Sequence, residues 1–204
     1  GSDDTVFDGE NVNFLFKIHD NAKVTFKNVK FINAFKQATA SYRESIYGGA
    51  LEIAKATVTL DNCSFMNNYV AYDPSINNSN YGGAISNLGD LTIINSYFDS
   101  NHVGSTSGLF GYGGAVYNKG RLLVNSTVFN KSYSDDFGYG GAIYNDGDFV
   151  MDRSVIANSI SLQEAKASAV FNAGNFTLLN SIIENNTIGR ASFYYIYGAI
   201  YNYG

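Results

Sequence analysis

Two short phrases with alternating hydrophobic and polar positions recur along the chain. The first begins Tyr-Gly-Gly-Ala, continues with an aliphatic residue and usually ends in Asn-x-Gly. Its copies lie at 47–55, 81–89, 112–120 and 139–147, with weaker forms at 166–174 and 197–204. The second phrase lies at 24–31, 58–65, 91–98, 122–129, 149–156 and 176–183. Alternation with a period of two residues predicts half-buried β-strands in both phrases.

The repeat period predicts how these strands are arranged. The last residue of the second phrase forms a hydrophobic column of Phe31, Phe65, Phe98, Phe129, Ile156 and Ile183. Successive members are 34, 33, 31, 27 and 27 residues apart, a period typical of repeat architectures. Helical periodicity is absent. We therefore predict an all-β fold, a right-handed parallel β-helix (β-solenoid) of six to seven coils, in which each strand pairs with its equivalent ~4.8 Å away.

Stacked coils place identical residues above one another. We expect an amide ladder of hydrogen-bonded side chains at Asn87, Asn118, Asn145, Asn172 and Asn202. The glycines two residues later, such as Gly89 and Gly120, are expected to have positive φ. The Gly-Gly-Ala step is expected where a Cβ atom would crowd a narrow interior.

The repeat divides the chain into two parts. Residues 1–23 are expected to form an N-terminal cap and first coil, and residues 24–204 a single domain of β-helix repeats cut from a longer chain. A solenoid end exposes strand edges, which a cap protects from pairing with other chains.

Variable insertions separate each second phrase from the next first phrase. They cover 34–46, 68–80, 101–111, 132–138, 159–166 and 186–196, and all are expected on one side of the solenoid, the loop flank. The candidate ligand-binding residues there are Tyr42, Arg43, Tyr72, Phe110, Tyr133, Asp135, Asp136, Phe137, Arg190, Phe193, Tyr194 and Tyr195. Aromatic rings with few charges suit contacts with sugars or another protein. The alternative is that these rings fold back and pin the loops.

A second candidate surface is the column that follows the aliphatic residue of the first phrase. Alternation predicts that Tyr117, Tyr144, Phe171 and Tyr201 face outward as an exposed aromatic stripe. The alternative is an aromatic stack that only stabilises the fold.

Composition restricts the partners. Charged residues make up 15% of the chain, its net charge is −5, and no run of Lys or Arg occurs. This disfavours nucleic acid and anionic membranes, which need clustered cations. No apolar run predicts direct membrane insertion of this fragment, which we expect to be monomeric. The single cysteine, Cys63, takes a position filled by Ser or Thr in other repeats and is expected to be a small packed side chain.

No catalytic constellation is evident. Asp90, Arg121 and Asp148 occupy equivalent positions, where a surface column of salt bridges is expected rather than a catalytic set. The Asp135-Asp136 pair lacks the spaced ligands of a calcium site. We therefore expect no cofactor, no metal and no enzymatic activity. Of six Asn-x-Ser/Thr sequons, the one at Asn77 lies in a long loop and is expected to be the best glycan acceptor.

Several residues carry a resemblance to known families. Gly-Gly-Ala followed by Ile, Leu or Val, together with Phe-x-x-Asn at Phe65–Asn68 and Phe98–Asn101, resembles the repeat signature of chlamydial polymorphic outer-membrane proteins. The fuller phrases YGGAIYNDG and LTIINSYFDSN are similar to adhesin-like surface proteins of methanogenic archaea, and the single cysteine favours the archaeal family. The resemblance covers about residue 24 to the end. It implies a secreted protein on the cell surface or cell wall that attaches to other microbes or host material.

Three functions remain open. The first is a non-enzymatic adhesin-like β-helix that binds a cell-surface glycan or a protein of another cell. The second is a passive stalk that presents a distal binding domain. The third, less favoured, is a polysaccharide lyase or hydrolase.

Overall fold

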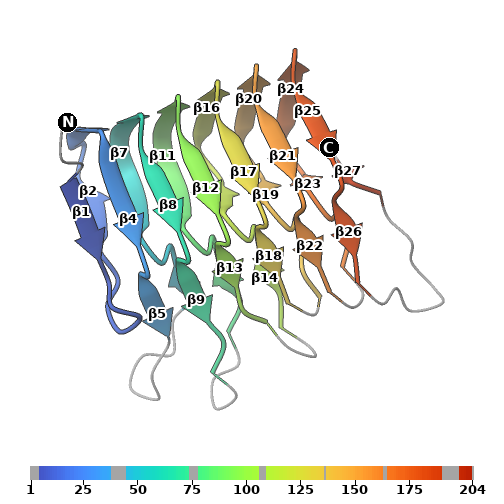
Figure 1. The fold of residues 1–204 in the computed structure, drawn as a ribbon, viewed down its shortest axis with the longest axis horizontal. Helices are drawn as coiled ribbons and strands as arrows, with labels where there is room; N and C mark the ends of the chain where they lie inside the picture. Colours follow the sequence, from blue (N-terminus) through green and yellow to red (C-terminus); the bar gives the residue numbers. More distant parts are fainter. Residues whose placement is uncertain are drawn as a thin grey trace.

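The computed structural model describes residues 5–37, 45–73, 78–105, 109–135, 137–162, 165–189 and 198–203. The regular structure of these residues consists of β-strands, which stack in parallel as a β-solenoid. Figure 1 shows the coils in a row, with the chain termini at opposite ends. This confirms the predicted all-β, parallel β-helix.

Four sheets run along the solenoid. Sheet 1 contains β1 (Thr5–Asp8), β4 (Val29–Ile32), β8 (Ser64–Met66), β12 (Tyr97–Asp99), β17 (Val128–Asn130), β21 (Val155–Ala157) and β25 (Ile182–Glu184). Sheet 2 contains β2 (Phe16–His19), β3 (Lys23–Lys27), β7 (Leu51–Asp61), β11 (Ile85–Ile94), β15 (Val116–Asn118), β16 (Arg121–Asn125), β19 (Ile143–Asn145), β20 (Asp148–Asp152), β23 (Val170–Asn172), β24 (Asn175–Leu179) and β27 (Ile200–Asn202). Sheet 3 contains β6 (Ile46–Tyr47), β10 (Asn80–Tyr81) and β14 (Gly111–Tyr112). Sheet 4 contains β5 (Phe35–Gln37), β9 (Tyr69–Ala71), β13 (His102–Val103), β18 (Tyr133–Ser134), β22 (Ile160–Ser161) and β26 (Thr187–Ile188).

Each complete coil passes through sheets 3, 2, 1 and 4 in that order, as in the run from β6 to β9. Isolated bridges at Tyr139 and Ala167 continue sheet 3 beyond β14. Where both strands are described, a strand of sheet 4 is followed by one of sheet 3, so these two sheets bound the loop flank. The solenoid makes about five turns rather than the predicted six to seven. The difference arises because the first coil, β2 to β5, has no strand in sheet 3, and the last coil contributes only β27.

The hydrophobic columns of the sequence form the core. Phe31, Phe65, Phe98 and Phe129 are fully buried, and successive rings are stacked with centroids 4.6–4.7 Å apart. The aliphatic residues of the first phrase form a parallel buried column with Leu51, Ile85, Val116, Ile143 and Val170. Burial of each such side chain contributes roughly 1.5–3 kcal/mol to stability, so the repeat itself drives stacking.

Asparagine supplies the corners between sheets. Asn28, Asn62 and Asn95, in the turn between sheets 2 and 1 of successive coils, have φ of 57°, 52° and 52°. Asparagine tolerates this left-handed region better than most residues, which accounts for its abundance in the chain.

The predicted positive φ at Gly89 and Gly120 is wrong. Positive φ belongs instead to the first glycine of each Gly-Gly step, such as Gly82 with a φ of 66°. A Cβ atom on Gly120 would lie 2.0 Å from the carbonyl oxygen of Gly89, so glycine is required there for close approach between coils. The expectation of a narrow interior at Gly-Gly-Ala is confirmed, since a Cβ atom on Gly83 would lie 2.3 Å from the carbonyl oxygen of His102.

Two polar ladders cross the solenoid from coil to coil. The predicted amide ladder forms, because each Nδ2 donates to Oδ1 of the next asparagine from Asn87 to Asn202, over 2.5–2.7 Å. In the second ladder, the backbone N–H of Cys63 donates to the hydroxyl of Ser96, and this pattern continues through Thr127 to Ser181. Cys63 begins this ladder and is 1% exposed, as expected for a small packed side chain.

The two ends of the solenoid differ. Phe7, Phe16 and Phe26 cluster over Phe31 at the N-terminal end, with ring centroids 4.8–6.0 Å apart. They cover the core beside β1. At the other end Leu178 is 39% exposed, whereas its partner in the preceding coil, Met151, is fully buried. The described residues therefore contain an aromatic plug at the N-terminal end and none at the C-terminal end.

Candidate functional site: an aromatic face on the loop flank

The predicted loop residues fall into two groups. Tyr42, Arg43, Asp136, Arg190, Phe193, Tyr194 and Tyr195 lie outside the described residues. Tyr72, Phe110, Tyr133, Asp135 and Phe137 lie within them, and each is partly exposed. Of these, Tyr133 and Asp135 contact His102 of the preceding coil, and the Phe110 ring contacts the Phe137 ring.

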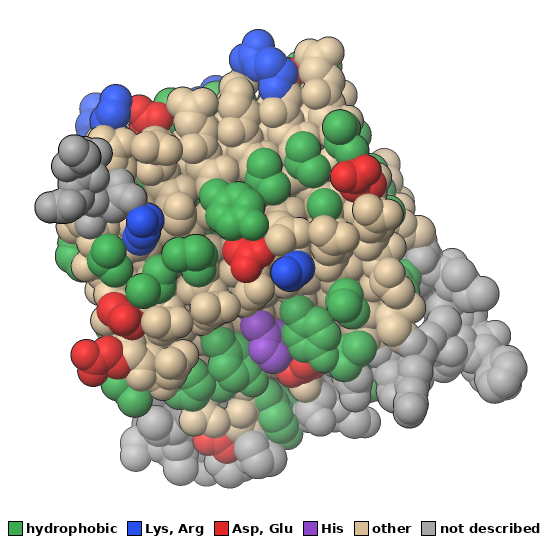
Figure 2. All heavy atoms as spheres, in the orientation of Figure 1, with side chains coloured by type: hydrophobic (Ala, Val, Ile, Leu, Met, Phe, Trp, Pro, Cys, Tyr) green, Lys and Arg blue, Asp and Glu red, His purple; other side chains and the backbone are tan. Residues whose placement is uncertain are grey.

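An outward-facing aromatic column runs along sheet 4. Parallel pairing places Phe35, Tyr69, His102 and Tyr133 next to one another, one from each coil. Tyr69 and His102 are stacked, with centroids 4.3 Å apart and planes 5° apart. Phe35 meets the edge of Tyr69 at 5.8 Å, and Tyr133 meets His102 at 4.5 Å. We call these four residues the aromatic face. Figure 2 shows hydrophobic side chains gathered around a histidine over this part of the molecule.

The local sequence explains why these rings point outward. In the same strands, Val70 and Val103 point inward and are fully buried, as strand alternation requires. A Cβ atom on Gly104 would lie 2.9 Å from the Tyr69 hydroxyl oxygen, so this glycine leaves room for the ring. The aromatic face is half-buried, which fixes the rings while leaving part of each one accessible.

A carboxylate is held at the edge of the aromatic face. Asp135 Oδ1 lies 3.0 Å from His102 Nε2, and the two side chains are 24% and 28% exposed. The backbone N–H of Ser105 donates to Asp135 Oδ2 over 3.3 Å. Burial raises the pKa of the Tyr69 phenol, and the negative charge of Asp135 raises it further, so this hydroxyl stays protonated at neutral pH. The face thus offers stacked rings beside polar groups.

Phe110 and Phe137 form a separate cluster. Phe110 lies edge-on to Phe137, with centroids 6.4 Å apart, and to Tyr139, at 5.3 Å. These contacts tie the loop residue Phe110 to the Tyr column of the Gly-Gly phrases. Tyr72 contributes its backbone carbonyl, which accepts a hydrogen bond from Gln37 Nε2 over 3.0 Å. Phe110 and Phe137 thus belong to a cluster of their own, whereas the Tyr72 backbone is also a hydrogen-bond partner of the Tyr69 hydroxyl in the aromatic face.

The predicted exposed stripe is wrong. Tyr117 and Phe171 are 6% and 4% exposed, and Tyr144 is half-buried. The tyrosines that precede each Gly-Gly step fold across them, as Tyr81 does against Tyr117 at 4.7 Å and Tyr139 against Phe171 at 4.9 Å. Tyr201, which is half-buried, stacks on Phe171 at 5.2 Å.

The two tyrosine columns therefore form one interlocked stack. Burial raises the pKa of Tyr112 and Tyr117 well above the usual range, with neighbouring tyrosines adding to the effect. Burial likewise raises the pKa of Tyr144 to about 12. Rings packed in this way stabilise the fold and offer little surface to a ligand.

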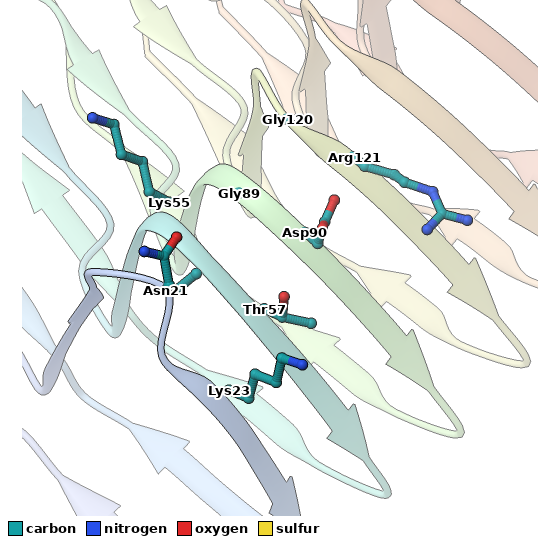
Figure 3. Close-up of a pocket in the computed structure, with 9 residues that line it drawn as sticks. Asn21, Lys23, Lys55, Thr57, Gly89, Asp90, Gly120 and Arg121 are labelled. Atoms are coloured by element: carbon teal, nitrogen blue, oxygen red, sulfur yellow. The ribbon is translucent and has the colours of Figure 1, made fainter.

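A shallow depression of about 450 Å³ lies beside the Gly89 and Gly120 turns. Asp90 and Arg121 line it, and Asp148 is in register with Arg121 one coil further on, as predicted. Figure 3 shows the Arg121 side chain extending away from the Asp90 carboxylate. Within the described residues Arg121 makes no ion pair, so the expected salt-bridge column does not form there. The depression is open, and the charged side chains of Asp90 and Arg121 that line it point away from each other.

The described part of the chain lacks two other kinds of functional feature. It contains no group of three or more His, Cys, Asp or Glu side chains placed to hold a metal ion. No helix in that part has the length and hydropathy to cross a membrane. Comparison with protein-family models, with curated proteins and with solved structures found no match to this chain.

Sequence reasoning missed most of the aromatic face. Phe35, Tyr69 and His102 were not among the predicted site residues, although Tyr133 and Asp135 were. The signal was present, because each member of the face follows a member of the buried Phe column by four residues, as Tyr69 follows Phe65. If these four positions are treated as one repeated column, the sequence predicts a row of aromatic side chains along one strand of each coil.

Proposed function

We propose that this chain is a non-enzymatic, adhesin-like β-helix that binds cell-surface carbohydrate at the aromatic face. The observation that carries the proposal is the column of contacting rings of Phe35, Tyr69, His102 and Tyr133 on the outer side of sheet 4, with Asp135 at its edge.

The chemistry of the face suits sugar rings. Sugars present apolar C–H faces that lie flat against aromatic rings, and hydroxyl groups that exchange hydrogen bonds with polar neighbours. Asp135 supplies acceptor oxygens and His102 a ring nitrogen close to the stacked rings. The rings are already ordered by their neighbours, so binding costs little side-chain entropy.

The placement at a cell surface rests on the repeat phrases. Their similarity to adhesin-like surface proteins of methanogenic archaea supports a secreted protein, exposed on the cell surface or cell wall, that mediates attachment. A protein of another cell is a second ligand class that an aromatic face suits, because aromatic residues are enriched at protein interfaces.

A passive stalk is the competing function. Parallel pairing from coil to coil in sheets 1, 2 and 4, with one register shift between Leu88 and Asp90 in sheet 2, supports it, since such a stack is a rigid spacer without any ligand. If the chain is only a stalk, the aromatic face serves packing and binds no ligand.

Binding of the purified chain to a glycan array and to intact microbial cells distinguishes these functions. We expect saturable binding that the double substitution Tyr69→Ser and Tyr133→Ser weakens by about five- to 150-fold. Each ring contact contributes about 0.5–1.5 kcal/mol, and about 1.4 kcal/mol corresponds to a tenfold change.

Tyr97→Ser is the matched control, because Tyr97 is 39% exposed on sheet 1, away from the aromatic face. It should leave binding intact. Thermal unfolding confirms that each variant is folded. If the unsubstituted chain binds neither glycans nor cells, the proposal fails and the stalk is favoured.

A further inference from the structure

We infer that, among the sequons in the described part of the chain, Asn185 is the asparagine that accepts an N-linked oligosaccharide in the folded chain. This rests on the proposed surface location, because such glycans are attached on the export route. The sequence contains six Asn-x-Ser/Thr sequons. They differ in the structure in the hydrogen bonds of the Asn amide and in the exposure of the Ser or Thr residue. They begin at Asn62, Asn77, Asn125, Asn130, Asn175 and Asn185.

Four of the sequon amides are already engaged. The Nδ2 atoms of Asn62 and Asn125 donate to Asn28 and Asp152 over 2.8 and 3.2 Å. The Nδ2 atoms of Asn130 and Asn175 donate to carboxylates of neighbouring coils over 2.6 and 2.8 Å. Modification of any of these nitrogens would break a contact between coils. Asn77 lies outside the described residues.

The exposure of the Ser or Thr residue that completes each sequon excludes further acceptor sites. Thr127 and Ser132, which complete the sequons of Asn125 and Asn130, are 1% and 0% exposed. An enzyme that must recognise the hydroxyl residue cannot reach these two in the folded chain. Thr187, which completes the sequon of Asn185, is exposed.

The turn at Asn185 presents the sequon to solvent. Asn185 is exposed, has a φ of 53°, and its amide makes no hydrogen bond within the described residues. The middle residue, Asn186, is anchored inward: its Oδ1 accepts from the Ser159 backbone N–H over 2.8 Å and its Nδ2 donates to the Ile156 carbonyl over 3.0 Å. Because Asn186 holds the turn to the solenoid, the residues on either side of it are left outward.

The reaction requires a lipid-linked oligosaccharide as the donor. The Asn185 amide nitrogen forms a bond to C1 of the first sugar, the bond from C1 to the lipid diphosphate oxygen breaks, and the lipid diphosphate leaves. One amide proton passes to a base of the transferase. No oxidant or reductant is involved.

The position has a consequence for the aromatic face. Thr187 pairs with Ile160, and Ile160 pairs with Tyr133, so Thr187 continues the column of the aromatic face. A glycan on Asn185 would therefore stand at the C-terminal end of that face.

The test is to incubate the folded chain with a sequon-specific oligosaccharyltransferase and its lipid-linked oligosaccharide. We expect an increase in intact mass that includes one oligosaccharide on Asn185, assigned by peptide mapping. Asn185→Gln should remove that oligosaccharide, and Thr187→Ala should do the same. Asn175→Gln is the matched control and should leave the modification of Asn185 unchanged.

Two results would overturn the inference. One is an unmodified Asn185 in the folded chain while the same enzyme modifies it in the urea-unfolded chain. The other is modification of folded chains at other sequons with Asn185 left free. Neither result bears on carbohydrate binding by the aromatic face, which is measured with the unmodified chain.

Discussion

Asn118 donates a hydrogen bond from Nδ2 to Oδ1 of Asn145 over 2.6 Å, and both side chains are completely buried. Each amide in this ladder bonds to an identical residue one coil away, and the Nδ2 atoms also donate to backbone carbonyls, as Asn118 does to Gly120 over 3.1 Å. The ladder therefore fixes the register between coils, because a one-residue slip would leave buried polar groups without partners.

Replacing Asn118 with Ala should destabilise the solenoid by roughly 2–4 kcal/mol. The substitution removes the ladder bonds with Asn87 and Asn145 and the bond to the Gly120 carbonyl, at about 0.5–1.5 kcal/mol for each hydrogen bond. Urea unfolding measures the loss. Asn202→Ala, at the exposed end of the ladder, should cost less than about 1 kcal/mol. Equal losses in the two variants would show that the ladder adds nothing beyond local packing.

Replacing Gly120 with Ala should be among the most damaging small substitutions in the chain. Its Cβ atom would lie 2.0 Å from the Gly89 carbonyl oxygen and would force adjacent coils apart. We expect a loss of about 3 kcal/mol or failure to fold. Gly198→Ala provides the control, since its nearest neighbour would be 3.6 Å away. Soluble yield and thermal unfolding compare the two, and a Gly120→Ala variant as stable as the parent would contradict the close approach.

The fold could be predicted because stacking makes identical residues neighbours. The repeat period alone placed Phe65 against Phe98 and Asn87 against Asn118, and both pairs are in contact. The exposure of Tyr117 was mispredicted because alternation assigns a side of the strand but not what covers that side. Its cover, Tyr81, comes from a different sheet of the neighbouring coil.

The candidate site was less accessible to prediction. His102 and Tyr69 are different residue types, so the sequence does not show them as a repeated position. Their equivalence appears only when positions are numbered from the buried Phe column. Their contact with Asp135 depends on how the chain leaves β18, which no repeat phrase specifies. Insertions vary from coil to coil, and pattern alone does not fix their side chains.

The interlocked tyrosine stack should make the protein sensitive to alkaline pH. The Tyr144 pKa is raised to about 12 in the folded chain, above about 10 for a free tyrosine. A raised pKa means that Tyr144 stays protonated to a higher pH in the folded state than in the unfolded state. The stability contributed by the neutral phenol is therefore complete below about pH 10 and declines between about pH 10 and 12. Tyr144→Phe keeps the ring and should move the midpoint of alkaline unfolding to higher pH.

Ultraviolet titration of tyrosinate gives the second measurement. In the folded chain a subset of tyrosines should resist ionisation until the protein unfolds, and Tyr144→Phe should reduce that subset by one. Tyr203→Phe is the control, since Tyr203 is 74% exposed and should not affect the resistant subset. Ionisation of all tyrosines near pH 10 with the fold intact would rule out the buried stack.

The ion pairs around Glu52 should give the opposite dependence, at acid pH. Burial opposes ionisation of Glu52, but hydrogen bonds and charge from Lys17 and Lys36 outweigh it and lower the pKa. Lys36 Nζ lies 2.7 Å from Glu52 Oε2 and also donates to the Tyr47 carbonyl over 2.8 Å. A lowered pKa contributes stability above about pH 4.3, the ordinary value for glutamate, and that stability is lost as pH falls through the folded pKa. Lys36→Met should therefore cost about 1–3 kcal/mol at pH 7 and less at pH 3.

Denaturant unfolding at the two pH values measures this difference. Lys27→Met is the matched control, because Lys27 pairs with Asp61 over 3.0 Å but is 65% exposed. Exposed pairs are screened by solvent and contribute little to stability, so this variant should lose little at either pH. A Lys36→Met loss that is the same at pH 7 and pH 3 would mean that Lys36 acts through its cation–π contact with Phe14, whose ring centroid lies 4.9 Å from Nζ, and not through the charge of Glu52.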